Sequence, residues 1–271
     1  GWPANGLAID ASAGDQTTPS LLAVGAGGTF VFSSDASKRI LAEHLGPDGT
    51  AMPGWTGSPL IVRDVDGTPA AYPYAAPDGE GGCFVAWAHA RGPRAEVWAH
   101  HLSWAGVLDP GWPEDGRQVA TGGANGIRGV APDGAGGLYV AYIKTFDPGS
   151  LDDDVYAARL LPDGNMAPGW PLAVCALSDW QALNSVSADS TGGLLLAWFD
   201  FRSYPPRIYV QRLRPDGSSP PGWQPDGNLV SDLPGYHDYP RLAPDGHGGA
   251  LVCFAEGFNN RGYVQRLLPN G

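Results

Sequence analysis

Carboxylate and imidazole side chains are the groups in this sequence that are best suited to bind a metal ion or to transfer a proton. The densest carboxylate cluster is Asp152–Asp154, and a shorter one lies in Asp64–Gly67. Calcium prefers several carboxylate and carbonyl oxygens together. The first cluster could therefore bind calcium, although a solvated hairpin loop is the simpler interpretation. The second is shorter than an EF-hand loop and lacks its closing glutamate.

The histidines of the chain do not define an obvious metal site. His100 and His101 are adjacent in a predicted strand, so their side chains point to opposite faces and cannot share one ion without distortion. His237 and Asp238 precede a predicted innermost strand and could line the mouth of a channel, although packing or surface polarity explains them more simply. The other histidines have no matching partners in the sequence: His44, His89 and His247.

Linear catalytic motifs are missing from the sequence. It contains no nucleophile elbow, P-loop, dinucleotide fingerprint or metalloprotease helix. Cys83, Cys175 and Cys253 show no CxxC spacing, and the apolar strands around Cys83 and Cys253 predict buried thiols. The sequence therefore predicts no catalytic residue, no metal site and no cofactor.

The elements that carry these side chains repeat along the chain. Gly-Trp pairs begin at residues 1, 54, 111, 169 and 222, with spacings of 53, 57, 58 and 53. Gly-Gly pairs end at residues 28, 82, 137, 193 and 249, with spacings of 54, 55, 56 and 56. Two independent markers thus define five copies of one unit: 1–53, 54–110, 111–168, 169–221 and 222–271.

Each unit contains four predicted strands. The second strand follows the Gly-Gly pair and is almost entirely apolar, as in Cys83–Trp87, Leu138–Tyr142 and Leu194–Trp198. Such a strand needs cover on both faces, because a half-exposed antiparallel strand alternates apolar and polar residues. Pro-Asp-Gly, which occurs seven times, favours tight turns between antiparallel strands.

These patterns predict one all-β domain over residues 1–271, a five-bladed β-propeller of four-stranded antiparallel blades. A β-solenoid is the alternative, but its repeats are usually shorter. The last unit supplies three strands of its own, so we expect a strand at residues 5–10 to complete the last blade, antiparallel to Tyr263–Leu267. The final Gly271 is also in phase with Gly1, which suits a tandem array or fibre of such units.

Composition limits the partners. The formal net charge is -12, with 28 acidic and 16 basic residues, so neither nucleic acid nor an anionic membrane is an expected partner. No apolar run reaches the roughly 18 residues of a transmembrane helix. The expected partners are other propeller units, copies of the chain itself, or glycans.

Residues 192–223 carry Gly-Gly-Leu-Leu-Leu-Ala-Trp-Phe-Asp-Phe-Arg, then Ile-Tyr-Val-Gln-Arg-Leu-Arg-Pro-Asp-Gly and finally Gly-Trp. This unit resembles the tandem "DGxGGxxVAWxDxR…IYxQRL…G…W" repeats of large secreted bacterial surface proteins. The resemblance covers all five units, although Ser33–Asp35 and Ala88–Ala90 replace the Phe-Asp-Phe-Arg segment in the first two. It implies a propeller outside the cell or on its surface.

The regular repeats, the acidic charge and this resemblance predict a non-catalytic structural or interaction module rather than an enzyme. One alternative is a lectin-like propeller, because Trp104, Trp180 and Tyr236 lie near predicted blade edges and could stack on sugar rings. Packing between blades would explain these three aromatic residues equally well. The other alternative is a polysaccharide-directed enzyme, whose site would gather side chains from several blades.

Overall fold

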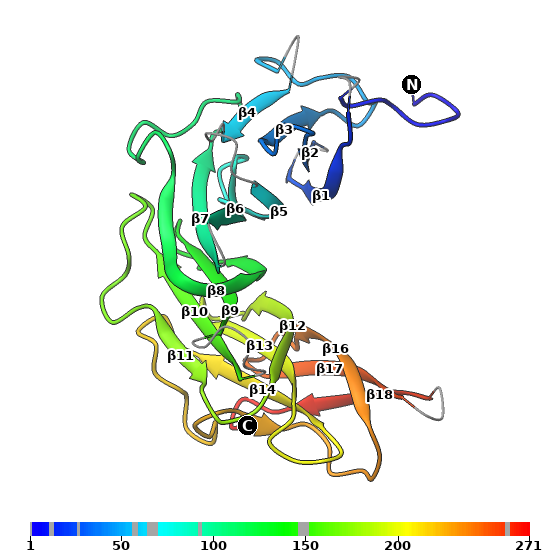
Figure 1. Ribbon diagram of the computed structural model, residues 1–271, viewed down its shortest axis with the longest axis vertical. Helices are drawn as coiled ribbons and strands as arrows, with labels where there is room; N and C mark the ends of the chain where they lie inside the picture. Colours follow the sequence, from blue (N-terminus) through cyan, green and yellow to red (C-terminus); the bar gives the residue numbers. More distant parts are fainter. Residues whose placement is uncertain are drawn as a thin grey trace. The chain divides into compact units, whose positions relative to one another are not determined.

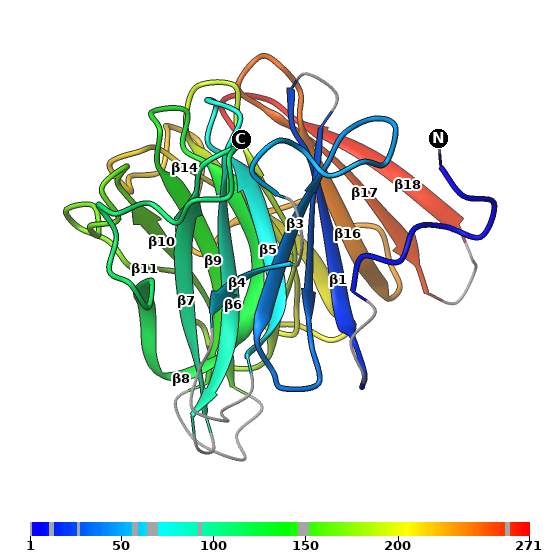
Figure 2. The same ribbon diagram turned by 90° about the horizontal axis from the view of Figure 1, so that it is seen from above.

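The structure is a computed structural model that describes residues 2–10, 14–25, 28–55, 59–63, 70–91, 94–145, 152–257 and 261–271 (Figures 1 and 2). The described residues form antiparallel β-strands joined by turns and loops, with no helix among them. Nor do they include a helix of the length and apolarity that crossing a bilayer requires. The chain divides into two compact units, Gly1–Gly122 and Gly123–Gly271.

Unit 1 contains two sheets, which we call blades 1 and 2. Blade 1 has the order β1 (Thr17–Ala23), β2 (Thr29–Ser34), β3 (Ile40–Leu45) and β4 (Leu60–Arg63). Blade 2 has the order β5 (Ala70–Pro77), β6 (Cys83–Arg91), β7 (Arg94–Leu102) and the first part of β8 (Arg117–Pro132). The long strand β8 continues into unit 2, which is why blades 2 and 3 share one seven-stranded sheet.

Unit 2 contains blades 3, 4 and 5. Blade 3 consists of the second part of β8, β9 (Leu138–Thr145), β10 (Asp153–Leu160) and β11 (Leu172–Cys175). Blade 4 consists of β12 (Gln181–Ala188), β13 (Leu194–Asp200), β14 (Arg207–Leu213) and β15 (Asn228–Leu229). Blade 5 consists of β16 (His237–Pro244), β17 (Ala250–Glu256) and β18 (Arg261–Leu267).

The strand expected at residues 5–10 does not form. Residues 2–10 contain turns and bends but no strand, and β18 has no neighbour beyond β17 in its sheet. Local hydrogen bonding explains this in part, because the amide of Gly6 donates to the carbonyl of Pro3 at 3.1 Å and closes a turn. The residues after this turn pair with no strand.

A carboxylate fixes the turn between the first and second strands in four of the five blades. In blade 4, Asp189 Oδ1 accepts the amides of Thr191 and Gly193 at 2.6 and 2.7 Å, and Oδ2 accepts Arg212 Nε at 2.7 Å. Burial by itself would raise the pKa of Asp189, but these donors outweigh it and hold the pKa below its ordinary value. The same carboxylate position is occupied in the other three blades by Asp78, Asp133 and Asp245.

The Gly-Gly pair of the sequence follows from this turn. The first glycine has a left-handed backbone, as Gly192 does with φ 83°. The second cannot carry a side chain: a Cβ on Gly193 would collide with the carbonyl oxygen of Leu213 and come within 2.6 Å of Asp189 Oδ2. In the four blades with a carboxylate turn, the second glycine of the marker is therefore a steric requirement of that turn.

Gly193→Ala should destabilise the fold by about 1–3 kcal/mol, because the new methyl group overpacks a turn held by backbone atoms. Gly262→Ala is the matched control, since no atom lies within 4 Å of its Cβ position, and it should change stability by less than about 0.5 kcal/mol. Urea unfolding of both variants measures the difference, and equal stabilities would contradict this account of the Gly-Gly pair.

Apolar second strands form the core between neighbouring blades of each unit. In unit 2 one buried cluster joins blades 3 and 4 and includes Tyr139 and Trp198, and another joins blades 4 and 5 and includes Leu195 and Phe254. In unit 1 a third cluster joins blades 1 and 2. The prediction that the second strands are covered on both faces is thus confirmed for β13, whose seven residues are all buried.

Trp198→Ala should cost about 3–5 kcal/mol of unfolding free energy, because the indole is fully buried and the substitution leaves a large cavity. The change also removes the bond from Nε1 to Asp200 Oδ2 at 2.7 Å. Trp104→Ala, at an indole that is 49% exposed, should cost less than about 1 kcal/mol. Chemical denaturation compares the two, and a similar small loss for both would show that Trp198 is not a core residue.

Candidate functional site

The first strands of four blades carry unusual backbone geometry. A bulge interrupts the pairing of β1, β5, β12 and β16 with the next strand of each blade. In three of these bulges a residue with positive φ stands directly before proline: Thr18 at 51°, Tyr72 at 57° and Tyr239 at 50°. Such conformations are strained for residues other than glycine, and they cluster at functional sites.

The bulges place aromatic side chains in solvent. Tyr72 is 60% exposed and Tyr239 is 69% exposed, and they belong to the first strands of blades 2 and 5. Large aromatic side chains normally bury much of their surface. Exposed tyrosines held by strained backbone therefore suit ligand contact. The sequence analysis missed this feature, but a signal was present: Tyr-Pro occurs at 72–73 and 239–240, at the same place in the repeat as Thr18-Pro19.

The bulge of β16 follows a set of polar and aromatic residues in unit 2 that we call the blade 4–5 site: Trp180, Phe201, Tyr236, His237, Asp238 and Tyr239. The ring of Phe199 links its two parts, with centroids 4.8 Å from Phe201 and 5.2 Å from Tyr236. Trp180 and Tyr236 each stand directly before an innermost strand, β12 and β16. The two loops are therefore equivalent, one in blade 4 and one in blade 5.

Trp180 and Tyr236, both predicted as candidate sugar-stacking residues, have different surroundings. The indole of Trp180 stacks on Phe201 with centroids 5.1 Å apart and an interplanar angle of 17°, yet it remains 41% exposed. Tyr236 packs edge-on against Phe199 of blade 4 at 5.2 Å. Trp180 is thus available to a ligand, whereas Tyr236 mainly joins two blades.

The buried His237 and the half-buried Asp238 have unused hydrogen-bonding capacity in the described structure. His237 is fully buried, and neither ring nitrogen has a hydrogen-bond partner among the described residues. Burial lowers its pKa, and the charge of Arg207 lowers it further, so the neutral imidazole is favoured. In the described structure Asp238 Oδ1 also lacks a partner, and burial raises the pKa of Asp238.

Glu256 completes the polar surroundings of His237. The two residues are opposite each other in the pairing of β16 with β17, so their side chains share a face. Tyr263 donates a hydrogen bond to Glu256 Oε2 at 3.0 Å. Asp238 lies opposite Ala255, on the other face of the sheet. The carboxyl group of Asp238, with its raised pKa, precedes the exposed Tyr239 in the chain and can donate a proton to a bound ligand.

The other aromatic and histidine candidates are structural. The backbone carbonyl of Trp104 accepts Trp55 Nε1 at 2.7 Å and contacts His44 Nδ1 at 3.2 Å. His101 takes the place of the arginine in the carboxylate turn of blade 2, at 3.0 Å from Asp78 and 2.8 Å from Asp109. His89 and His100 are fully buried in blade 2, and His247 is exposed in the turn between β16 and β17.

The cysteines fit the predictions in part. Cys83 and Cys175 are buried, and burial raises the pKa of the Cys175 thiol to about 12. Cys253 is exposed, so its predicted burial is wrong. Alternation explains the difference: in β17 the buried residues are Ala250, Val252 and Phe254, and Cys253 points to the opposite face.

The acidic run begins a strand instead of a loop. Asp153 and Asp154 open β10, and Thr145 Oγ1 donates to Asp153. Over the described ranges, no group of three or more His, Cys, Asp or Glu side chains is arranged to hold a metal ion. The other acidic candidate, Asp64–Gly67, lies outside the described residues. Burial, together with the charges of Asp152 and Asp153, raises the pKa of Asp154 to about 6.

Asp154→Asn should stabilise the protein near pH 7.5 and have little effect near pH 4. The native pKa of Asp154 lies above the unfolded value of about 3.9, so native stability falls as the pH rises from about 4 through 6. A neutral side chain removes this loss, which is up to about 3 kcal/mol for a shift of this size. Unfolding at the two pH values tests it, and a difference that does not change with pH would refute the assignment.

Three solved structures share this fold. A polysaccharide lyase PL25, an ulvan lyase bound to -[GlcA(1-4)Rha3S]-, matches with 11% identity and a TM-score of 0.57, over 92% of this chain and 66% of the lyase. The polysaccharide lyase Uly1 matches with 8% identity and a TM-score of 0.55, over 94% and 58% of the two chains. An α-L-arabinanase of Penicillium chrysogenum matches with 13% identity and a TM-score of 0.50, over 94% and 93%.

No protein-family model matches the chain, and no curated protein sequence does either. The structural matches, together with the antiparallel blades, identify the fold as a β-propeller. The resemblance to secreted repeat proteins stays a prediction, because it concerns sequence motifs that these matches do not test.

The expectations of a non-catalytic structural or interaction module, and of a protein that is not an enzyme, are corrected by these matches. The similar structures are polysaccharide lyases and an arabinanase. The reasoning failed because regular blades and missing linear motifs do not argue against catalysis on this fold. A propeller site gathers single side chains from separate strands, so the pattern within one repeat carries little information about it.

Proposed function

We propose that the protein is a polysaccharide-active enzyme that binds its glycan at the blade 4–5 site. The observation that carries the proposal is the strained, exposed Tyr239 next to the half-buried Asp238, whose Oδ1 is enclosed without a hydrogen-bond partner in the described structure. Tyr239 and Trp180 offer two exposed aromatic faces on which the apolar face of a sugar ring can stack. Asp238 is the candidate general acid, because burial favours its protonated form.

The shared fold supports this proposal. The PL25 lyase was solved with a sulfated uronic disaccharide repeat and the Penicillium arabinanase with arabinobiose. The net charge of -12 favours an uncharged glycan, because a polyanionic chain would be repelled by the acidic surface. We therefore expect hydrolysis of a neutral polysaccharide, in which a protonated carboxyl group donates to the glycosidic oxygen.

The buried His237 acts as a positioning residue in this scheme. It is fully enclosed and stands beside Asp238 in the chain, so it cannot contact the glycan itself. Its ring packs edge-on against Phe254 at 5.2 Å, which fixes the start of β16 two residues before the strained Tyr239.

Asp238→Asn should lower kcat on a neutral polysaccharide such as arabinan by about 10²–10⁴-fold with little change in KM, because it removes the proton donor and keeps the shape. Tyr239→Ala should instead raise KM by about tenfold, through loss of stacking worth about 1.4 kcal/mol. Trp104→Ala, at an exposed indole of unit 1, is the matched control and should leave both constants unchanged.

Reducing-sugar release from a panel of neutral and uronic polysaccharides measures these effects. Turnover that is undiminished in Asp238→Asn would exclude this residue as the acid. Turnover of none of the panel, together with no binding of any member in affinity electrophoresis, would overturn the proposed function.

We also propose that the five blades close into one ring in which residues 2–10 complete blade 5. The repeated contacts between neighbouring blades support this arrangement, since each unit packs its blades face to face through the same positions. Action on a polysaccharide agrees with a location outside the cell or on its surface, which the repeat resemblance implies.

A further inference from the structure

Blades 1 and 2 of unit 1 carry two bulges of the same kind in strands that pack against each other, β1 and β5. Thr18-Pro19 in β1 and Tyr72-Pro73 in β5 each place two residues opposite one residue of the second strand. In both bulges the residue before proline has positive φ. Two strained segments therefore lie in neighbouring strands of one unit, and strain of this kind is typical of functional sites.

The hydroxyl group of Thr18 links the two bulges. The amide of Tyr72 donates to Thr18 Oγ1 at 3.4 Å, and Thr18 Oγ1 shares a second hydrogen bond of 3.0 Å with Oγ of the buried Ser34. Unit 2 contains a similar link, because the amide of Leu242 in blade 5 donates to Ser185 Oγ of blade 4 at 3.1 Å. In both units a hydroxyl group of one blade thus anchors the first strand of the next.

A pocket of about 380 Å³ opens between the two bulges of unit 1. Tyr72 is 60% exposed at this pocket, and Tyr74 is half-buried. The lining combines aromatic rings, proline rings and hydroxyl groups, and none of its six side chains is charged: Thr18, Pro19, Ser20, Tyr72, Pro73 and Tyr74.

This lining suits a neutral sugar better than a charged ligand. The exposed ring of Tyr72 can stack on the apolar face of a sugar, and the hydroxyl group of Ser20 can exchange hydrogen bonds with sugar hydroxyls. A charged ligand would meet no opposite charge among the lining residues, and the net charge of -12 disfavours an anion further. The chemistry of the pocket therefore favours a neutral glycan.

The pocket lacks the carboxyl group of the blade 4–5 site. The strand pairing makes Ala70–Tyr72 of blade 2 equivalent to His237–Tyr239 of blade 5. The strained, exposed tyrosine is the same in both, whereas Ala71 stands in place of Asp238, the candidate acid. Unit 1 thus retains the means to bind a glycan without the group that would donate a proton to it.

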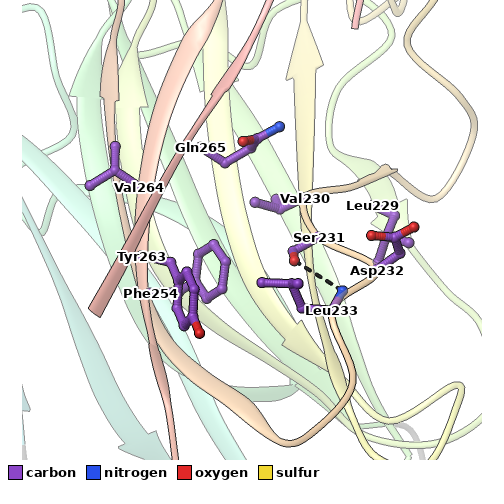
Figure 3. A pocket seen from close by; sticks show the side chains of 9 residues that line it. All are labelled: Leu229, Val230, Ser231, Asp232, Leu233, Phe254, Tyr263, Val264 and Gln265. Atoms are coloured by element: carbon purple, nitrogen blue, oxygen red, sulfur yellow. Dashed lines mark hydrogen bonds between the residues drawn. The ribbon is translucent and has the colours of Figure 1, made fainter. Parts of the chain in front are cut away.

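The groove beside β18 in unit 2 differs from this pocket, although a tyrosine lines it as well. It has a volume of about 460 Å³ and is lined by Leu229–Leu233, Phe254 and Tyr263–Gln265 (Figure 3). Tyr263 stacks on Phe254 with centroids 5.5 Å apart and donates to Glu256 Oε2, so its ring is engaged within blade 5. Asp232 also adds a charge to the lining. The exposed Tyr72 and the uncharged lining therefore distinguish the pocket of unit 1.

We propose that the pocket between β1 and β5 is a second glycan-binding site, which holds a neutral polysaccharide by stacking on Tyr72 and does not cleave it. The inference rests on the proposed function for the class of ligand but not for catalysis. Thr18 is a positioning residue of this site, because its hydroxyl group accepts the amide of Tyr72 and so holds the backbone from which the ring projects.

Affinity electrophoresis of the full chain in gels that contain linear arabinan, xylan or galactomannan tests the site. Tyr239→Ala should still bind at least one of these polysaccharides, because the pocket of unit 1 is intact. Adding Tyr72→Ala to this variant should raise the dissociation constant at least about tenfold, through loss of the stacking ring. Trp104→Ala in the same background is the matched control, since it removes another exposed ring of unit 1, and it should change binding by less than about twofold.

Two conservative variants separate stacking from loss of structure. Tyr72→Phe keeps the ring and should bind within about twofold of its parent. Thr18→Val keeps the shape of the side chain but removes the hydroxyl group, so it should weaken binding by about threefold or more, and Thr18→Ser should restore it. Thermal unfolding followed by circular dichroism confirms that each variant is folded.

Equal dissociation constants with and without Tyr72→Ala would overturn the second site, even if the protein cleaves a polysaccharide. A tenfold loss caused by Tyr72→Ala would support it even if none is cleaved, so the two proposals fail separately. Grooves lined by aromatic rings can also bind proline-rich peptides. Binding of a polyproline peptide without binding of any of the three polysaccharides would therefore overturn the glycan assignment, as would binding of none of these probes.

Discussion

The carboxylate turn is the constraint on which four of the five blades depend. One aspartate, such as Asp133 in blade 3, accepts the amides of Ala135 and Gly137 and also the guanidinium of Arg159 from the third strand. A single side chain thus closes the first hairpin and ties it to the next strand. Because hydrogen bonds to an ionised group are stronger than neutral ones, the turn geometry is fixed firmly enough to align three strands.

Blade 1 shows what happens when this group is missing. Val24 stands where the other blades have aspartate, and His44 stands where three of them have arginine. His44 is buried and stacks on Phe30 with ring centroids 4.0 Å apart. A Cβ atom on Gly28 would lie only 2.5 Å from His44 Nε2. Burial lowers the pKa of His44, so a neutral aromatic ring replaces the ion pair. Packing therefore substitutes for charge in one blade without loss of the strand order.

Much of the fold could be predicted from the sequence because its signals are local. The apolar run Leu194–Trp198 lies within β13, and the run Ile208–Leu213 lies within β14. The strand predicted at residues 5–10 does not form in the structure. Strand pairing depends on a partner, and a local sequence pattern does not supply one. The exposed Cys253 likewise depends on which face of blade 5 is covered, and its neighbours in sequence are apolar on both sides.

The candidate site was harder to predict than the fold. His237 and Asp238 were noted in the sequence, but their burial and missing hydrogen bonds are tertiary properties. The left-handed backbone of Tyr72 and Tyr239 contradicts local preference, because a residue before proline normally takes an extended conformation. Strain of this kind becomes visible only when the surrounding strands hold it in place.

The tryptophan bonds from blade to blade make the stability of each blade depend on its neighbours. Trp170 and Trp223 each tie one blade of unit 2 to the turn of the next. Such a linear series of couplings behaves like a one-dimensional cooperative chain, in which a blade with two partners is more stable than a blade with one. Hydrogen exchange in unit 2 would then be slowest in blade 4, and opening would begin at an uncoupled edge and advance one blade at a time.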